Sequence, residues 1–304
     1  MTAPEIAVGL AACGRPDGIE RCLRALEAQT EPPASVIVVD QDPSDEARAA
    51  ASSCTLPDVS YLEQGRLGLS ASRNLALRST TAEVLAVTDD DCVPDPSWVA
   101  AVSRALERAP RPQAVTGPIL PLGEQPPGTF AISLRESDVA VDHSGRMQPW
   151  GVGSGANFAA PVDVLARSGG WDERLGVGSP GRAAEDAELL YRLLLEGAVV
   201  RYEADALVRH EWQKRSRRLD TRYSYGYGVG ALCGLRLARR DAYAATLLGG
   251  YARLHVRPLL GGVRRRDRGR IAEHGRALAS LGPGLLYGLR ASRRPASFTQ
   301  TGTP

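Results

Sequence analysis

The sequence predicts an α/β protein: a doubly wound, mostly parallel sheet with helices on both faces, plus a basic helical C-terminal extension. Three observations support this. Apolar runs alternate with amphipathic helical patterns four times between residues 5 and 108. The runs are continuous, as expected of strands buried on both faces. Beyond Arg217 the pattern becomes helical and basic. We therefore expect one domain over residues 1–215 and an extension over residues 216–304.

The first half of the chain contains four strand-and-helix pairs. We expect strands at residues 5–12, 35–40, 59–62 and 83–88. A short helix is expected over residues 43–53. Three other helices are expected to begin at capping residues, which accept hydrogen bonds from the first free backbone amides. Those caps are Asp17, paired with Glu20, then Ser70, and Asp95 followed by Pro96.

The second half is less regular and richer in proline and glycine. We expect strands at residues 114–117, 156–159, 199–202 and 206–210. Expected helices are 161–168, closed by the glycine pair at 169 and 170, and 183–196. The stretch 171–182 has the composition of a mobile loop, and its Trp171 is expected either in the core or stacked on a sugar. Three basic helices are expected at 221–240, 242–260 and 270–290.

Charge divides the chain into two parts. Residues 201–304 hold 21 Arg and Lys against 7 Asp and Glu, although the net charge of the whole chain is only +2. A basic segment beside an acidic body suggests an anionic partner such as a membrane surface or a lipid phosphate. The alternatives are a solvated tail, packing on the first domain, or a homodimer. No recognition motif accompanies the arginines, so we expect no nucleic acid.

The compartment expected from the sequence is the cytoplasm, including the inner face of the cell membrane. Five scattered cysteines show neither metal spacing nor a disulfide framework. No charged and then apolar leader precedes the first strand, and no apolar run approaches the roughly 20 residues of a spanning helix.

An acidic triplet, Asp89, Asp90 and Asp91, ends the fourth strand. Ligands of parallel sheets bind outside the carboxyl ends of the strands, where Asp40 of the second strand is also expected. Adjacent carboxylates repel one another unless a cation is bound, and Mg²⁺ or Mn²⁺ with substrate phosphates is the natural occupant. An acidic surface turn is the alternative reading.

A second acidic pair, Glu185 and Asp186, opens the helix that follows the glycine-rich loop. The helix dipole favours carboxylates at this position, so simple stabilisation explains either residue alone. A carboxylate beside a mobile loop also suits a general base. His210, near the end of the last strand, is a candidate ligand that nothing in its spacing marks.

Six segments in order carry a wider resemblance: VGLAACGRPDGIERCLRALEAQT, VIVVDQDPSDEA, GLSASRNLAL, VLAVTDDDCVPDPSWV, GSGANFAAPVDVLARSGGWDERLGVGSPGRAAEDAELLYRLLLEGA and YEADALVRHEW. Over residues 5–212 the chain resembles the family 2 glycosyltransferases, which have the GT-A fold. The fourth segment resembles the strand leading to that family's Asp-x-Asp metal motif. The last two resemble its acceptor-side Glu-Asp segment and the stretch that contains its metal-binding histidine.

The resemblance implies a role for each matching residue. Nucleotide contacts are implied for Asp40, Arg66, Arg73, Asp89 and Asp90. The metal ligands implied are Asp89, Asp91 and His210. Asp186 would be the general base, and Glu185 would orient the acceptor or Asp186.

The function implied is metal-assisted, inverting transfer of a sugar from a nucleotide-diphosphate donor to a hydroxyl acceptor. The acceptor would belong to a polysaccharide, a glycolipid, or a lipid-linked or secondary metabolite. Two alternatives stay open. A nucleotidyltransferase also uses a carboxylate-bound metal beside such a sheet, but it would favour a glycine-rich basic turn after the first strand. A non-catalytic carbohydrate-binding scaffold would not need the acidic residues and the histidine together.

Overall fold

The computed structural model describes residues 3–293 and confirms the predicted α/β fold. Its main sheet has eight strands in the order β3-β2-β1-β4-β10-β6-β11-β9. Neighbours among the first four strands are parallel, whereas β10 runs antiparallel to both β4 and β6. The strands are β1 (Ile6–Ala12), β2 (Ser35–Asp40), β3 (Val59–Glu63), β4 (Val84–Asp89), β6 (Ala114–Thr116), β9 (Val141–His143), β10 (Phe158–Pro161) and β11 (Val200–Tyr202).

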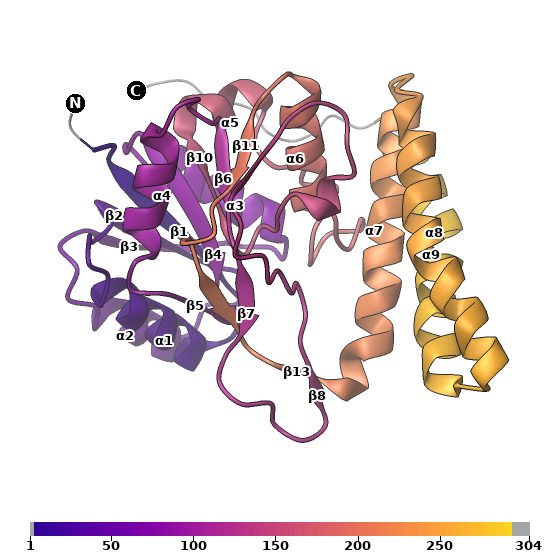
Figure 1. Ribbon diagram of the computed structural model, residues 1–304. Coiled ribbons are helices and arrows are strands. Elements are labelled where there is room, and N and C mark those ends of the chain that lie inside the picture. The colour runs from indigo at the N-terminus through magenta and orange to yellow at the C-terminus, as the bar shows by residue number, and fades with distance from the viewer. Residues whose placement is uncertain (1–2, 294–304) are drawn as a thin grey trace.

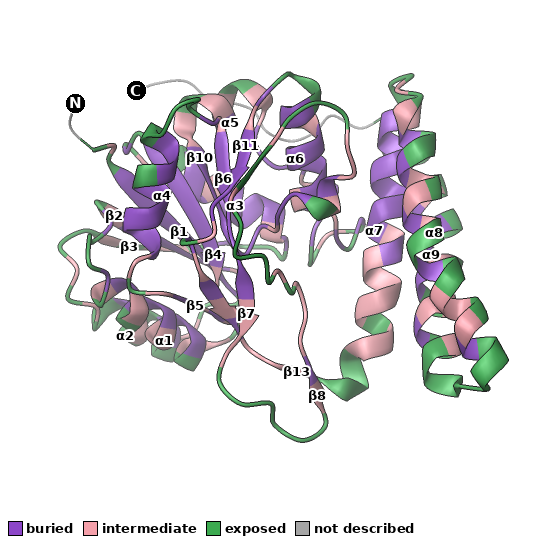
Figure 2. Ribbon diagram, in the orientation of Figure 1, coloured by how far each residue is buried: buried purple, intermediate pink, exposed green. Residues whose placement is uncertain are grey.

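Helices cover both faces of this sheet (Figure 1). On one face, α1 (Pro16–Glu27), α2 (Asp45–Ser52) and α4 (Trp98–Glu107) share an apolar core with Val8 and Leu10 of β1. On the other, α3 (Leu69–Ser79), α5 (Val162–Ser168) and α6 (Glu185–Leu195) share a core with Leu85 and Val87 of β4. Figure 2 shows the buried residues concentrated in the strands and in the helix faces turned toward them. Continuous apolar strands are thus buried on both sides, as predicted.

Strand register brings the acidic strand ends to one edge of the sheet. Ala12 at the end of β1 pairs with Asp40 of β2, and Ala11 pairs with Asp89 of β4. Just beyond this edge, β5 (Cys92–Pro94) and β12 (Val208–His210) form a small sheet with β7 (Ile119–Pro121). In that sheet His210 lies directly opposite Cys92, which places the histidine beside the acidic triplet.

Three predicted caps are wrong, although their helices form. Helix α1 begins at Pro16, so Asp17 lies in its first turn, and the residue at the cap position, Arg15, makes no side-chain capping bond. Helix α3 follows Gly68, and the Ser70 hydroxyl bonds the carbonyl of Leu175 instead. Tertiary contacts and proline geometry replace the local bonds that the sequence pattern suggested.

The fourth helix also begins later than predicted. Helix α4 starts at Trp98, and the Asp95 carboxylate accepts hydrogen bonds from Ser97 in the preceding turn. The same carboxylate also forms a salt bridge of 2.9 Å with Arg209. Asp95 therefore connects this turn to β12 rather than capping the helix.

The extension forms three long helices: α7 (Arg218–Ala238), α8 (Tyr243–Arg265) and α9 (Arg268–Ala291). They stand side by side at one end of the molecule (Figure 1). A glycine at every fourth position of α7, at 226, 230 and 234, faces the α9 backbone. A Cβ at Gly226 would meet the Ala277 carbonyl oxygen at 2.2 Å. Only glycine therefore allows the two helices to approach this closely.

An apolar core joins α7 and α8 to the rest of the molecule. Leu175, Ala187 and Tyr191 share a buried cluster with Leu232 of α7 and Leu247 of α8. Within residues 3–293, no helix combines the length and the apolar character needed to cross a lipid bilayer.

Candidate active site

A cleft of about 1400 Å³ opens at the carboxyl edge of the parallel strands. Its walls come from all parts of the chain. The strand ends contribute the acidic triplet, α6 contributes Glu185 and Asp186, β12 contributes His210, and α7 and α8 contribute aromatic and basic side chains. The cleft therefore lies at the edge where parallel sheets bind their ligands.

The three aspartates of the triplet face three different partners. Asp89 accepts a hydrogen bond from Arg73 at 3.0 Å. Asp90 turns back toward β1 and accepts the backbone amide of Cys13 at 3.0 Å. An Asp91 oxygen lies 3.3 Å from the Nε2 atom of His210. The triplet therefore divides its charge among a guanidinium, a backbone amide and an imidazole.

Asp91 and His210 form a pair suited to a divalent cation. The Nδ1 atom of His210 lies 2.8 Å from the carbonyl oxygen of Glu211 and so carries the proton that is donated to it. The Nε2 atom of the ring and an Asp91 oxygen then face each other at 3.3 Å, so a nitrogen ligand and an oxygen ligand converge on one place. A backbone carbonyl that fixes the tautomer is the usual outer support of a metal-binding histidine. The donor set therefore fits Mg²⁺ or Mn²⁺.

Cys92 lies close enough to join this pair. Its sulfur, an Asp91 oxygen and a His210 nitrogen all lie within 4.8 Å of one another. Burial and the neighbouring Asp91 and Asp89 carboxylates raise the pKa of the Cys92 thiol well above its ordinary value. A protonated thiol is a poor ligand for a hard cation. Cys92 is therefore a packing residue beside the pair.

A buried arginine joins the triplet to α6. Arg73 is 2% exposed and bonds both Asp89, at 3.0 Å, and Glu185, at 3.1 Å. Asp186 points elsewhere: one oxygen accepts the backbone amide of Gly155 at 3.0 Å. A Cβ at Gly155 would lie 2.4 Å from Arg73, so a glycine is needed for this packing. The acids of α6 and of β4 are thus held in one assembly.

Buried carboxylates outnumber guanidiniums in this assembly. Burial and the adjacent Asp186 raise the pKa of Glu185 to about 7, against the opposing influence of Arg73. Burial likewise raises the pKa of Asp90 to about 7 and raises the pKa of Asp89. Raised carboxyl pKa values mean that excess negative charge is held out of water. Such a site favours an incoming cation.

Two predicted nucleotide contacts lie outside the cleft. Asp40 is fully buried, and its oxygens accept the Tyr61 hydroxyl at 2.8 Å and the Asp42 amide at 3.0 Å. Arg66 has a side chain 62% exposed and pairs with Glu173. Their neighbour Gln41 does line the cleft. The structure thus gathers Arg73, the triplet, the α6 pair and His210, but not Asp40 or Arg66.

The loop 171–182 is firmly anchored along its first half. Trp171 is 1% exposed and packs edge-on against Phe158, so this tryptophan belongs to the core and is not available to stack on a sugar. The Asn74 side chain bonds both the amide and the carbonyl of Trp171, at 2.8 Å each. Only the later part of the loop, from Val177, lines the cleft.

Several lining residues were missed by the sequence analysis. Arg15, directly after β1, lies 3.7 Å from Asp91 and also pairs with Glu211. Its place after a parallel strand was the signal that could have identified it. Arg135, Trp150 and Tyr225 also line the cleft. No local pattern marks them, because they lie far apart in the sequence and only tertiary packing gathers them at the cleft.

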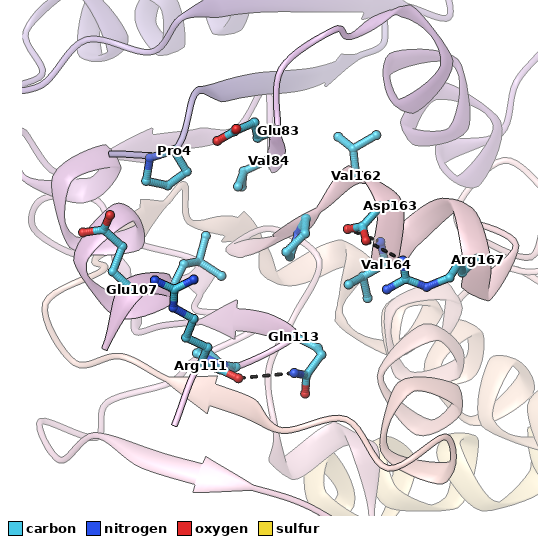
Figure 3. A pocket seen from close by; sticks show the side chains of 13 residues that line it. Pro4, Glu83, Val84, Glu107, Arg111, Gln113, Val162, Asp163, Val164 and Arg167 are labelled. Carbon is cyan, nitrogen blue, oxygen red and sulfur yellow. Dashed lines mark hydrogen bonds and ion pairs between the residues drawn. The ribbon is translucent and has the colours of Figure 1, made fainter. Parts of the chain in front are cut away.

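Another cavity, of about 850 Å³, is lined by Pro4, by Glu83 and Val84 at the start of β4, and by residues of α5 (Figure 3). Its polar lining includes Asp163 and Arg167, which pair with each other, and Gln113, whose amide bonds the Arg111 carbonyl at 3.2 Å. The acidic triplet and His210 are absent from its lining. The catalytic residues we expect therefore belong to the larger cleft.

Comparisons with known proteins agree with this geometry. Residues 7–133 match the model of "Glycosyl transferase family 2", and residues 84–289 match that of "Glycosyl transferase family group 2". The chain is similar to the pre-mycofactocin glycosyltransferase of Mycobacterium tuberculosis, with 28% identity over 193 residues, which cover 61% of this chain and 38% of that protein.

The chain is also similar to the glucosyl-dolichyl phosphate glucuronosyltransferase of Haloferax volcanii, with 27% identity over 65% of each chain. This chain therefore spans less than two thirds of each of these relatives. The mannosyltransferase PcManGT from Pyrobaculum calidifontis, solved with GDP-Man and Mn²⁺, superimposes with a TM-score of 0.61. That match covers 97% of this chain and 88% of the other at 19% identity, and it shows that the fold is of the GT-A type.

The two family matches together run from β1 to α9 and contain the acidic triplet, the α6 pair and His210. The chain belongs to the family 2 glycosyltransferases.

Proposed function

We propose that this protein transfers a sugar from a nucleotide-diphosphate donor to a hydroxyl acceptor, with inversion at the anomeric carbon. The observation that carries the proposal is the position of Asp186. It lines the cleft together with the acidic triplet and His210. A single base on the acceptor side and a cation site on the donor side suit one direct displacement, which inverts the reacting centre.

Asp186 is the better general base of the α6 pair. Its carboxylate is partly exposed, whereas Glu185 is 7% exposed and bonded to Arg73. The Gly155 amide fixes one Asp186 oxygen and the Ala187 amide, at 2.6 Å, fixes the other. A fixed carboxylate facing the cleft can accept the proton of the attacking hydroxyl, a contribution of roughly 10²–10⁴-fold. Glu185 positions α6 through Arg73.

On the donor side, Asp91 and His210 would hold Mg²⁺ or Mn²⁺, with Asp89 as a further candidate ligand. The cation, when bound, neutralises the charge that develops on the departing diphosphate. Arg73 keeps Asp89 in place, and Asp90 orders the turn through Cys13. Asp40 and Arg66 stay predictions for the nucleotide side. Neither lines the cleft, but the neighbouring Gln41 does.

We assign residues 1–215 to the catalytic domain and residues 216–304 to an extension that borders the acceptor side. The acceptor hydroxyl would belong to a polysaccharide, a glycolipid or a lipid-linked molecule. Helix α8 supports the lipid-linked choice, because Val256, Leu260 and Val263 form an exposed apolar stripe. The helix contains four arginines and no acidic residue. We propose that this stripe lies on an anionic membrane surface, at the inner face of the cell membrane.

The membrane contact is tested by sedimentation with vesicles of phosphatidylglycerol or of phosphatidylcholine. The protein should sediment with the anionic vesicles, and Leu260→Asp should abolish this without lowering the melting temperature. Equal sedimentation of the variant would refute the contact.

The catalytic proposal is tested with Asp186→Asn. Mn²⁺ and a nucleoside diphosphate should raise the melting temperature of the variant as they do that of the wild type, because the donor subsite is untouched. Transfer should fall by about 10²–10⁴-fold. Wild-type turnover by the variant would contradict the assignment of the base. A nucleotidyltransferase would instead release pyrophosphate from nucleoside triphosphates, and a scaffold would bind without turnover.

A further inference from the structure

The two ends of the cleft differ in charge. At one end lie Asp89, Asp90 and Asp91, with only Arg15 and Arg73 to offset them. We call the part of the lining that holds four arginines and the aspartate Asp220 the basic wall; Arg222 of this wall is already paired with Glu273 at 2.7 Å. Those arginines are Arg135, Arg182, Arg217 and Arg222. A cation accounts for the acidic end, but it leaves the basic wall without a ligand.

Arg135 is the most telling of these arginines. Its Nη2 atom donates to the carbonyl oxygens of Trp150 and of Gly153, the latter at 3.0 Å. Its Nε atom is buried and has no hydrogen-bond partner. Within residues 3–293, no carboxylate forms a salt bridge with Arg135. A guanidinium held beside a cleft without a counter-ion is arranged to receive an anion.

The surroundings place Arg135 near the reacting end of the acceptor. Its partner Gly153 lies two residues before Gly155, whose amide holds the proposed base Asp186. Ser133, two residues before Arg135, faces the hydroxyl of Tyr225 on α7. Burial lowers the pKa of the Arg135 guanidinium, against the opposing influence of the Asp186 carboxylate, with which it forms no salt bridge.

Arg182 forms a second, separately anchored positive charge on the same side. Its guanidinium carbon lies 5.4 Å from the ring centre of Tyr223 and 5.3 Å from that of Tyr227, both on α7. Its backbone has a φ of 69°, a left-handed conformation that is costly for a residue with a side chain. Among the described residues, no carboxylate forms a salt bridge with it. The rings of two tyrosines, rather than a carboxylate, therefore hold the Arg182 guanidinium in place.

We propose that the basic wall binds a phosphate group carried by the acceptor, with Arg135 and Arg182 as its principal contacts. This rests on the proposed function, because it assumes that the cation end holds the donor. A phosphate monoester carries between one and two negative charges near neutral pH, which suits two unpaired guanidiniums better than the single charge of a carboxylate does. The acceptor is then a phosphorylated alcohol or sugar rather than a neutral glycan.

The test uses the full chain with its donor subsite filled by Mn²⁺ and a nucleoside diphosphate. Geranyl phosphate, geraniol, geranoate and inorganic phosphate are then titrated, with melting temperature and tryptophan fluorescence as readouts. We expect geranyl phosphate to bind at least tenfold more tightly than geraniol or geranoate. Inorganic phosphate distinguishes the source: binding as tight as that of geranyl phosphate would show that the lipid chain adds nothing, while the phosphate subsite would stand.

Two variants test the contacts. Arg135→Gln and Arg182→Gln should each weaken geranyl phosphate binding by about tenfold, the usual effect of losing one charge-assisted contact. Affinity for Mn²⁺ and the nucleoside diphosphate should change less than twofold. The control is Arg167→Gln, an exposed arginine at the other cavity, which should bind like the wild type.

Three results would overturn the proposal. The first is that geraniol or geranoate binds as tightly as geranyl phosphate. The second is that both variants bind geranyl phosphate as tightly as the wild type does. The third is that geranyl phosphate displaces the nucleotide. Displacement would mean that the arginines serve the donor diphosphate. Failure of the proposed function looks different, because Mn²⁺ with any nucleoside diphosphate would then produce no stabilisation at all.

Discussion

Glu185 and Glu188 lie one turn apart on α6, and both are buried, yet their surroundings are opposite. Glu185 shares the single guanidinium of Arg73 with Asp89, and burial raises its pKa to about 7. Glu188 lies between Arg192, at 2.7 Å, and Arg236 of α7, at 2.5 Å. Burial alone would raise the pKa of Glu188, but these guanidiniums outweigh it and lower the pKa to about 2.

The difference separates a site from a support. The Glu188 cluster is fully compensated and connects α6 to α7 through Arg236. The Glu185 cluster holds more negative than positive charge, which favours an incoming cation and destabilises the empty protein. One helix thus carries an under-compensated charge at its start and a compensated ion cluster one turn later.

The largest stability effect is expected from breaking the compensated cluster. Glu188→Gln leaves Arg192 and Arg236 buried without their carboxylate, so the free energy of unfolding should fall by about 3–5 kcal/mol. Urea denaturation followed by circular dichroism measures this loss. A loss below about 1 kcal/mol would mean that the two guanidiniums find other partners and that the cluster does not support the extension.

The opposite outcome is expected for the neighbouring residue. Glu185→Gln removes an under-compensated charge, so stability should hold or rise, while Arg73 loses one of its two anchors. Transfer should then fall by about 10- to 100-fold, as expected when an orienting contact is lost. Steady-state kinetics and urea denaturation of the same preparation separate the two effects. A stability loss as large as that of Glu188→Gln would show that the two clusters do not differ in kind.

The pH dependence of stability should also differ between the clusters. The folded-state pKa of Glu185 is raised from an ordinary value of 4.5, so its contribution is fully present below pH 4.5 and is lost as the pH rises through about 7. The melting temperature of metal-free Glu185→Gln, relative to that of the wild type, should therefore rise between pH 5 and pH 8. A constant difference across that range would contradict the raised pKa.

For Glu188 the sign is reversed. Its lowered pKa gives stability that is present above pH 4.5 and is lost as the pH falls toward about 2. The difference in melting temperature between wild type and Glu188→Gln should therefore shrink in acid, measured from pH 5 down to pH 3. If the difference stays constant or grows there, the Glu188 pKa is not lowered.

The smallest effect should come from an exposed pair of an arginine and a carboxylate. Arg167 and Asp163 lie four residues apart on α5 with side chains 69% and 66% exposed. Solvent screens such a pair, so Arg167→Gln should change the free energy of unfolding by less than about 0.5 kcal/mol. A larger change would mean that burial is not what separates the clusters of α6 from ordinary surface charge.

Much of the fold was predictable from local patterns. The buried strands and the apolar faces of α1 and α6 were correctly identified, because continuous apolar runs and the 3.6-residue helical periodicity are local features of the sequence. The caps at Asp17, Ser70 and Asp95 were not correctly identified, since contacts elsewhere in the fold determine each side-chain partner or helix start. Ser70, for instance, bonds a carbonyl 105 residues away.

The candidate site was predictable in part for the same reason. Parallel strands must end at one edge, so the acidic triplet could be placed without a structure, and motif order identified Glu185, Asp186 and His210. Arg135 and Arg182 could not be identified in this way. The proposal for these two arginines rests on the absence of a salt bridge to a carboxylate among the described residues. It also rests on tyrosines of α7, a helix that begins only at residue 218.

By itself, the sequence determined the acidic ends of the parallel strands, the apolar faces of the helices and the family, because each depends on neighbours along the chain. Only the tertiary structure decided which acid is compensated. Charge balance at Glu185 and Glu188 depends on Arg73 and Arg236, which lie 112 and 48 residues away and reach the two acids only when the sheet and the extension pack against α6. Electrostatic energy is set by distance and burial in space, and the folded structure alone supplies both.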